Sequence, residues 1–171
     1  MCKNSFEKGA NLYKKSLEKS AKVLKKAESR DYELSLAAYK EDDTFKLFIN
    51  DIGLLNYMLK IRPADILDDD LSLFKGAFVE NYVASQLAAN EIDLYYWLSD
   101  GIAEIDFLLY NDDGIIPVEV KAANNTQSKS LKVYMEKFKP NYVIRISTKN
   151  FGYNAETKIK SIPLYAIFCI K

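Results

Sequence analysis

The chain has 171 residues, of which 49% are hydrophobic, so it can bury the core of one domain, with or without a small appendage. Lys and Arg together number 24, as do Asp and Glu, so the formal net charge is zero and no global basic field is available to hold nucleic acid. The chain contains no histidine, which excludes Ser-His-Asp and Cys-His catalysis and His-ligated zinc. Any catalysis must rest on carboxylates, lysine, tyrosine or a hard metal ion.

The two cysteines, Cys2 and Cys169, lie near opposite ends of the sequence. This usage is typical of a reducing compartment and predicts no disulfide framework. The region after Met1 is polar rather than a signal peptide, and no apolar run reaches the roughly 18 residues of a transmembrane helix. We therefore expect a cytoplasmic protein that does not enter a membrane.

Residues 1–70 are predicted to form a small N-terminal helical subdomain. Apolar residues from Phe6 to Leu24 recur at spacings of three and four, which predicts a helix over about residues 6–28. The following segments are predicted as a strand over 32–39, a turn over 40–43, a return strand over 45–49 or a lead into the next helix, and a helix over 51–59 that ends at Arg62-Pro63. Helix, hairpin and helix in this order resemble a winged-helix arrangement.

Residues 71–171 are predicted to form a second, α/β domain with a mixed sheet. The predicted elements are a helix over 71–90, strands over 93–98, 103–110 and 115–121, a helix over 128–138 with Ser128 as its N-cap, a strand over 142–147, a polar loop over 148–160 and a final strand over 162–170. The final strand is nearly continuously apolar, so it lies within the sheet, covers an edge of the sheet or forms a surface for a homodimer. The order of elements is α-β-β-β-α-β-β.

An ordered set of charged residues crosses this second domain. Glu80 lies on the first predicted helix, Asp106 on the second strand, and Glu119 and Lys121 on the third. Because strand side chains alternate, Glu119 and Lys121 share a face, and Val118 and Val120 face a core. Glu104 and Asp106 likewise share a face, with Ile105 and Phe107 opposite.

The turn between the second and third strands sets how these residues meet. A two-residue loop at Asp112-Asp113, or a four-residue loop over 111–114, places Asp106 opposite Glu119. A turn at Asp113-Gly114 instead brings Asp106 opposite Lys121. Each of these alternatives puts the two acids and the lysine on one face of the sheet.

Paired carboxylates without His or Cys suit Mg²⁺ or Mn²⁺. We expect Asp106, Glu119 and Glu80 to hold the metal, with Glu80 as a further ligand or an outer hydrogen-bond partner. The metal would polarise a phosphoryl oxygen, and Lys121 would orient the attacking water. Asp106, Glu119 and Lys121 are therefore the predicted catalytic residues. The alternative is that Glu119 and Lys121 form an ordinary pair on the surface of a strand.

Several segments carry a family resemblance. These are FKLFINDIGLL (45–55), KGAFVENYVASQL (75–87), YYW (95–97), AEIDFLL (103–109), IIPVEVKA (115–122) and IPLYAIF (162–168). The chain resembles the C-terminal domain of unknown function that follows the ATPase module in a bacterial and archaeal AAA-type ATPase family. That domain is similar to the PD-(D/E)xK nuclease superfamily.

The resemblance implies a restriction-endonuclease-like α-β-β-β-α-β core, a divalent metal and an AAA-type ATPase domain as partner, in the same chain within the family. In it, Asp106, Glu119 and Lys121 match the Asp, Glu-x-Lys signature, and Glu80 matches the acid of the first helix. Leu98 follows the Tyr-Trp pair where the family often has a basic residue. No G-x-x-x-x-G-K-[ST] motif occurs, so this chain is not expected to hydrolyse ATP itself.

Three functions follow as hypotheses. The first is a Mg²⁺-dependent nuclease acting on DNA or another nucleic acid, and the second is a catalytically inactive nuclease-fold module that binds a protein or DNA. The scarcity of Arg favours the second, because Arg occurs at only three positions. The third is a winged-helix DNA binder within residues 1–60. The aromatic residues Tyr95, Tyr96 and Trp97 could stack on bases, but are more often core in such strands.

Overall fold

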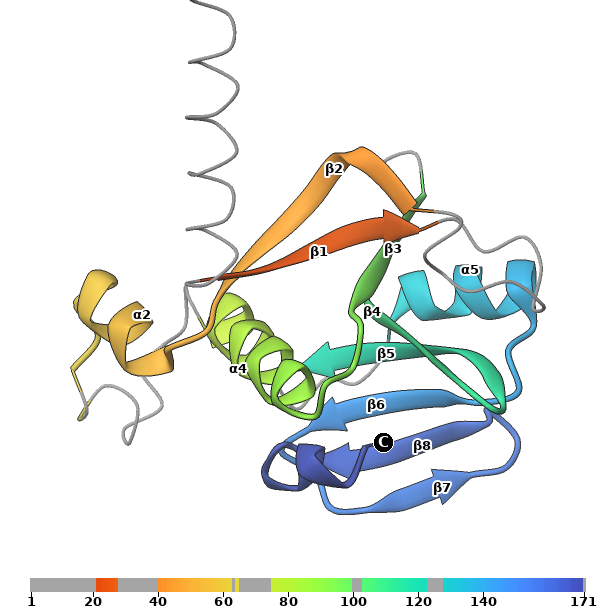
Figure 1. The fold of residues 1–171 in the computed structure, drawn as a ribbon. Coiled ribbons are helices and arrows are strands. Elements are labelled where there is room, and N and C mark those ends of the chain that lie inside the picture. The colour runs from red at the N-terminus through yellow and green to blue at the C-terminus, as the bar shows by residue number, and fades with distance from the viewer. Residues whose placement is uncertain are drawn as a thin grey trace, which may run out of the picture.

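The computed structural model describes residues 21–27, 40–62, 64, 75–99, 103–122 and 128–170 (Figure 1). Its helices are α2 (Ile52–Met58), α4 (Lys75–Ala89), α5 (Lys129–Phe138) and the 3₁₀ helix η2 (Leu164–Cys169). Its strands are β1 (Ala21–Ala27), β2 (Lys40–Ile49), β3 (Tyr95–Ser99), β4 (Ala103–Asn111), β5 (Gly114–Lys121), β6 (Val143–Ser147), β7 (Gly152–Asn154) and β8 (Ile159–Pro163). Three predicted segments lie outside the described residues: the strand over 32–39, residues 6–20 and 28 of the helix predicted over 6–28, and the three consecutive aspartates at 68–70, which are expected to connect the two predicted domains.

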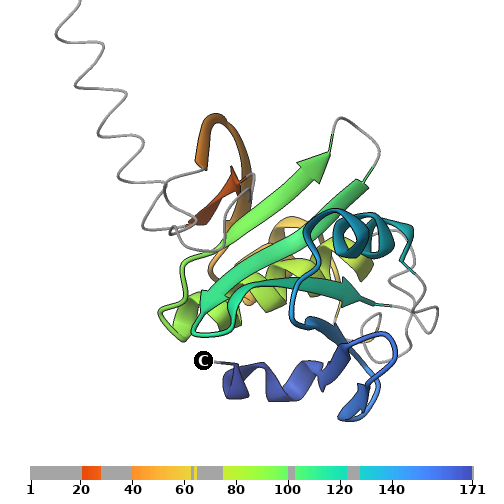
Figure 2. The same ribbon diagram turned by 90° about the vertical axis from the view of Figure 1, so that its right-hand side faces the viewer.

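The strands form one mixed sheet in the order β2-β1-β3-β4-β5-β6-β8-β7. Neighbours β1–β3, β5–β6 and β6–β8 are parallel, and the other neighbours are antiparallel. The β1–β2 pair forms the edge of the sheet farthest from β7, and Figure 2 shows it at the opposite end of the molecule from η2. The predicted mixed α/β class is confirmed, and the order from α4 to β6 is the predicted α-β-β-β-α-β.

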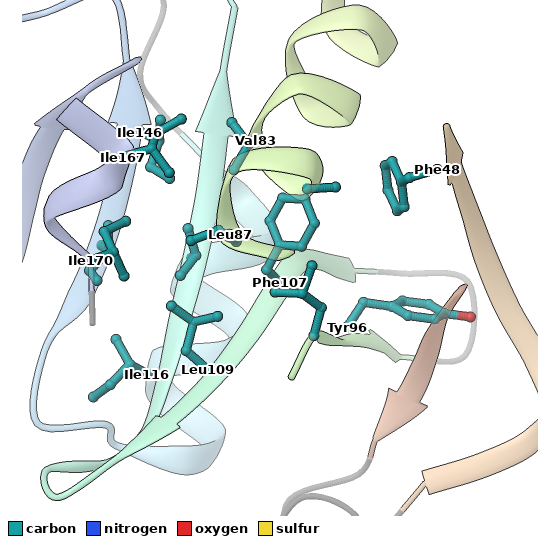
Figure 3. Close-up of a cluster of buried hydrophobic side chains, with 14 residues drawn as sticks. Phe48, Val83, Leu87, Tyr96, Phe107, Leu109, Ile116, Ile146, Ile167 and Ile170 are labelled. Carbon is teal, nitrogen blue, oxygen red and sulfur yellow. The ribbon is translucent and has the colours of Figure 1, made fainter. Parts of the chain in front are cut away.

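Two separate hydrophobic clusters cover the two faces of the sheet. On one face, α4 and η2 pack through residues such as Val83, Leu87 and Ile167 onto Phe107 and neighbouring strand residues (Figure 3). On the other face, α5 packs through buried Leu131 and Tyr134 onto Trp97 and Ile105. We call these the α4 face and the α5 face. The prediction that Tyr96 and Trp97 are core residues is confirmed, because they are 3% and 1% exposed.

Three predicted elements of the N-terminal half need correction. Residues 21–27 are a strand and not the end of a helix, and they pair with β2 and β3, so tertiary pairing overrides the helical periodicity. The predicted turn over 40–43 is part of β2, although the strand over 45–49 is confirmed. The helix predicted over 51–59 is present as α2 but ends at Met58, before Arg62-Pro63. The winged-helix arrangement stays a prediction.

Two predicted elements of the C-terminal half are also wrong. The polar loop predicted over 148–160 contains β7 and the start of β8, because the polar residues of this segment lie on an exposed hairpin at the sheet edge. The final strand predicted over 162–170 stops at Pro163, after which the apolar residues form η2. Ala166 and Ile167 are buried there against the α4 face, so a helix and not a strand buries the apolar run.

The predicted caps and turns hold where the structure describes them. Ser128 precedes α5, and its hydroxyl oxygen accepts a hydrogen bond from the Leu131 amide at 3.1 Å, which confirms it as the N-cap. Asn111 pairs with Gly114, which confirms the two-residue Asp112-Asp113 loop. Gly114 has a φ of 94°, a conformation that residues with a Cβ rarely adopt.

A β-bulge in β4 changes which side chains face which helix. Tyr95 pairs with Leu108 and Trp97 pairs with Ile105, so three steps along β4 match two steps along β3. As a result Ile105 packs on the α5 face and Phe107 on the α4 face, although two residues apart in a regular strand share a face. The prediction that Ile105 and Phe107 lie together is therefore wrong, and the bulge is the physical reason.

No helix within the described residues combines the length and the apolar character needed to cross a bilayer.

Candidate metal site

Three carboxylates gather on the α4 face. Glu80 from α4, and Glu104 and Asp106 from β4, each offer an oxygen, and these three oxygens lie within 4.8 Å of one another. All three residues are partly buried. Carboxylate oxygens without nitrogen or sulfur ligands suit Mg²⁺ or Mn²⁺. Like charges at this separation repel, so the group requires positive charge nearby.

Lys46 of β2 supplies part of that positive charge. Its Nζ lies 2.9 Å from Oε1 of Glu80, forms an ion pair with Glu104 as well, and stands 5.3 Å from the centre of the Tyr96 ring. Burial lowers the pKa of Lys46, but the two carboxylates outweigh this effect and the pKa lies above its ordinary value. The ammonium group therefore stays charged, and it bridges two of the three acids.

A side-chain amide next to Glu80 fixes this bridge. Asn81 is 6% exposed, its Nδ2 donates to the carbonyl oxygen of Ile49, and the Ile49 amide donates to its Oδ1, both at 2.8 Å. The two bonds copy the pairing between antiparallel strands and hold α4 against the end of β2. Because Lys46 precedes Ile49 on β2, this clamp keeps Lys46 within reach of Glu80.

Asp106 is the most perturbed of the acids. Its Oδ2 accepts a hydrogen bond from the Val120 amide of β5 at 2.7 Å. Burial, followed by the negative charges of Glu119 and Glu80, raises the pKa of Asp106 to about 7, while the bond from Val120 and the charge of Lys46 oppose the rise. A cation near this carboxyl would favour its ionised form.

Glu119 is buried on β5, one residue before Val120. It is 4% exposed, and its Oε1 lies 2.5 Å from Nζ of Lys121. Its Oε2 is buried and has no hydrogen-bond partner among the described residues. Burying a carboxylate oxygen without a partner is costly, so this atom fits a ligand or donor other than the groups in the described part of the chain.

Glu119 and Lys121 point away from the α4 face. Val118 and Val120 pack into the cluster of the α4 face, as predicted, so the residues that alternate with them emerge on the α5 face. On that face Glu119 is the register partner of Arg145 on β6. Burial lowers the pKa of Arg145, an effect that the charge of Glu119 opposes, and Nε of Arg145 is buried without a hydrogen-bond partner in the described part of the chain.

The structure thus separates the four predicted site residues into two groups. Glu80 and Asp106 come together, with Glu104 as a third acid, whereas Glu119 and Lys121 form their own pair. That both acids and the lysine form one site stays a prediction: the bulge in β4 brings Asp106 beside Glu80, while alternation along β5 turns Glu119 and Lys121 away from Val118 and Val120. The groups still communicate, since the charge of Glu119 raises the pKa of Asp106.

Sequence reasoning missed three residues of this site. Glu104 was placed on the same face as Asp106 but not in the site, and its spacing of two residues from Asp106 was the available signal. Lys46 belongs to the segment 45–55 that carries the family resemblance, yet nothing in its own pattern indicates a contact with Glu80. Asn81 had no signal beyond its position beside Glu80.

Comparison with known proteins gives one informative result. No curated protein and no solved structure matches the chain. Residues 75–167 match the family described as Domain of unknown function (DUF4143), which covers more than half of the 171 residues. The match includes Glu80, Glu104, Asp106, Glu119 and Lys121, whereas Lys46 precedes it. The chain therefore belongs to this domain family of unknown function.

Proposed function

We propose that the chain is a metal-dependent nuclease-like domain that acts on the phosphodiester bonds of nucleic acid. The observation that carries the proposal is the Asp106 carboxylate, which lies beside Glu80 and Glu104 and feels the charge of Glu119. A merely structural sheet gains nothing from gathering so many like charges at one point. The resemblance of Asp106, Glu119 and Lys121 to the PD-(D/E)xK signature supports the same reading.

The residues present fit a hard divalent cation. Asp106 and Glu80, with Glu104 or Glu119, would hold Mg²⁺ or Mn²⁺, and such an ion would give the buried Oε2 of Glu119 the partner that it lacks among the described residues. When bound, the metal supplies Lewis acidity toward a phosphoryl oxygen and toward a water molecule. Asp106 would hold the metal in its ionised form, because a bound cation opposes the burial and the negative charges that raise its pKa to about 7.

Two lysines have different roles in this proposal. Lys121, held at Glu119 by the 2.5 Å ion pair, would orient the attacking water and stabilise the charge that develops on the phosphoryl group. Lys46 balances Glu80 and Glu104 when no metal is bound. Lys121 therefore acts on the reaction, whereas Lys46 positions the acids.

We further propose that the domain works beside an AAA-type ATPase module, because this domain family is commonly associated with such ATPases. The chain has no phosphate-binding G-x-x-x-x-G-K-[ST] motif, so ATP hydrolysis would come from that partner. The ATPase would move or remodel the nucleic acid, and the present domain would cut it.

Calorimetric titration with Mn²⁺ tests the metal site directly. We expect one binding event in the parent, a loss of at least tenfold in affinity for Asp106→Asn and Glu119→Gln, and no change for the exposed Glu136→Gln. Nicking of plasmid DNA under the same conditions should require the metal and should disappear in Asp106→Asn and Lys121→Met. Absence of Mn²⁺ binding by a folded parent protein would refute the proposal.

A second function is favoured by the separation of the two groups. Lys121 and Glu119 emerge on the α5 face, while Lys46 already bridges Glu80 and Glu104 on the α4 face. This arrangement also suits a nuclease-fold module that binds a protein or DNA without catalysis. Metal binding without cleavage on any single-stranded or duplex substrate would favour this second function.

A further inference from the structure

A cavity of about 710 Å³ lies between α5 and the strands β6, β8 and β7. Its volume falls within the roughly 300–1,000 Å³ of typical ligand sites. Lys132 of α5, Arg145 of β6 and Lys149 line it, and Glu136 is the only carboxylate among its lining residues. Three cations against one anion leave two positive charges, in a chain whose formal net charge is zero. The cavity therefore favours an anionic ligand.

The remaining lining residues offer flat and apolar surface beside hydrogen-bonding groups. Tyr153 of β7 is 61% exposed and borders the cavity together with Met135 of α5. The amide of Asn154 and the hydroxyl of Ser161 also line it. An aromatic ring and a thioether suit the face of a nucleobase, while amide and hydroxyl groups suit its polar edge.

Arg145 connects this cavity to the Glu119–Lys121 pair. It lines the cavity, it is the register partner of Glu119 on the neighbouring strand, and its buried Nε has no hydrogen-bond partner among the described residues. Where Arg145 lines the cavity, its guanidinium group would give a phosphate oxygen a charge-assisted hydrogen bond. A ligand phosphate at Arg145 would lie next to Glu119 on the same face of the sheet.

We propose that the cavity binds one unpaired nucleotide of a single-stranded nucleic acid, with its phosphate at Arg145 and its base against Tyr153 and Met135. This proposal rests on the proposed function and specifies its substrate as a strand with an unpaired nucleotide. A base that lies between Tyr153 and Met135 has left its base pair and its stack, so an unpaired nucleotide enters the cavity more readily than a paired one. Lys132 and Lys149 would contact the flanking phosphates.

The test is fluorescence anisotropy of a labelled hexathymidylate with the full chain in EDTA, so that binding is measured without metal or cleavage. We expect Arg145→Gln to weaken binding at least tenfold, and Lys132→Gln and Lys149→Gln to weaken it about threefold each. Glu136→Gln should strengthen binding two- to threefold.

Lys129→Gln is the matched control for Lys132→Gln. Both lysines are exposed on α5, but Lys129 is not among the residues that line the cavity. A plot of the logarithm of the parent's association constant against the logarithm of salt concentration should have a slope of about −2. Each neutralised phosphate of a single strand contributes about −0.7 to this slope, and the cavity is expected to neutralise three phosphates. Each lysine variant of the cavity should reduce that slope by about 0.7.

The outcomes separate this proposal from the proposed nuclease function. Binding in EDTA that is lost in Arg145→Gln supports the cavity, whatever the result of the metal titration. Equal weakening in Lys129→Gln and Lys132→Gln, unchanged binding in folded Arg145→Gln, equal competition by a blunt duplex, or no binding by the parent would each overturn it. Circular dichroism of every variant establishes that it is folded.

Discussion

The two faces of the sheet carry opposite chemistry. The α4 face gathers Glu80, Glu104 and Asp106 around one lysine, whereas the α5 face presents Arg145, Lys132 and Lys149 around a cavity. Strand β5 takes part in both, because its Val120 amide holds Asp106 and its Glu119 is the register partner of Arg145. A chain without net charge can thus build strong local fields of both signs by sorting its charges between faces. Substitutions on one face can therefore show whether the other face responds.

The largest expected effect is on packing. Trp97 on the α5 face is 1% exposed and makes edge-to-face contacts with Tyr134 and Phe138, at ring-centre distances of 5.2 and 5.6 Å. Trp97→Ala should lower the free energy of unfolding by about 3–5 kcal/mol, and Phe48→Leu on the α4 face by only about 1 kcal/mol. Urea denaturation monitors both. Equal losses would mean that neither face depends on a dominant aromatic anchor.

The next effect is a dependence of stability on pH that belongs to the α4 face. Because the pKa of Asp106 is raised from 3.8 to about 7 in the folded protein, the folded state holds a proton that the unfolded state releases earlier. Stability is therefore greatest at the acidic end of this range and falls as the pH rises from about 4 through 7, by on the order of 3 kcal/mol. Urea denaturation in EDTA should show this slope for the parent. The slope should be nearly absent in Asp106→Asn.

Divalent metal should reverse the same dependence. Ions that bind the ionised Asp106 stabilise the folded protein above pH 7 and do little at pH 4, where the carboxyl is protonated. Thermal unfolding at the two pH values, with Mn²⁺ or EDTA, measures the effect. A stabilisation by Mn²⁺ that is as large at pH 4 as at pH 8 would place the ion elsewhere.

A smaller effect is expected at the clamp between α4 and β2. Asn81→Ala removes both hydrogen bonds to Ile49 and should cost about 1–3 kcal/mol of stability. It should also loosen the Lys46–Glu80 contact and leave hexathymidylate binding unchanged, since the cavity lies on the α5 face. Denaturation and anisotropy measurements on one sample compare the two faces directly. A parallel loss of oligonucleotide binding would show that the faces are coupled.

The smallest effect concerns the competition between Lys46 and a metal. Lys46→Met removes the ammonium group that bridges Glu80 and Glu104, and it should raise the affinity for Mn²⁺ about three- to tenfold. The loss of stability in EDTA should remain below about 1 kcal/mol, because such partly exposed ion pairs contribute little. Lys129→Met, an exposed lysine of α5, serves as the control. Lower Mn²⁺ affinity in Lys46→Met would show that the lysine assists the metal site.

Much of the fold between Lys75 and Ser147 could be predicted from sequence because its signals are local. The helical pattern of α4, the Asn111–Gly114 turn and the Ser128 cap each depend on residues close in the chain. The failures at β1 and η2 have a common cause. Residues 21–27 adopt a strand because β2 and β3 pair with them. The apolar residues of η2 form a helix because the cluster of the α4 face buries them. In both cases the determining contact is with residues far away in the sequence, so the local pattern does not reveal it.

The candidate site was predictable in composition but not in geometry. Strand alternation correctly gave the faces of Val118 and Val120, and hence of Glu119 and Lys121. It failed at Asp106 because the extra residue of the β4 bulge follows from the pairing with β3, which no single strand encodes. Lys46 was out of reach for a similar reason, since its contact with Glu80 spans 34 residues.

The attachment of β2 has a consequence for local opening. The β1–β2 pair joins the rest of the sheet through the registered pairs Lys25–Tyr95 and Lys26–Tyr96, and β2 is also held by the Asn81 clamp, the Lys46 ion pairs and buried Phe48. Because only two registered pairs link β1 to β3 among the described residues, we expect this edge to open before the centre of the sheet in hydrogen exchange. Each opening withdraws Lys46 from Glu80 and Glu104 and exposes two carboxylates to solvent ions. Hydrogen exchange of the β2 amides and cation binding at the acidic site are therefore thermodynamically linked. A partner that binds β2 would change the affinity of Glu80 and Glu104 for cations without contacting these residues.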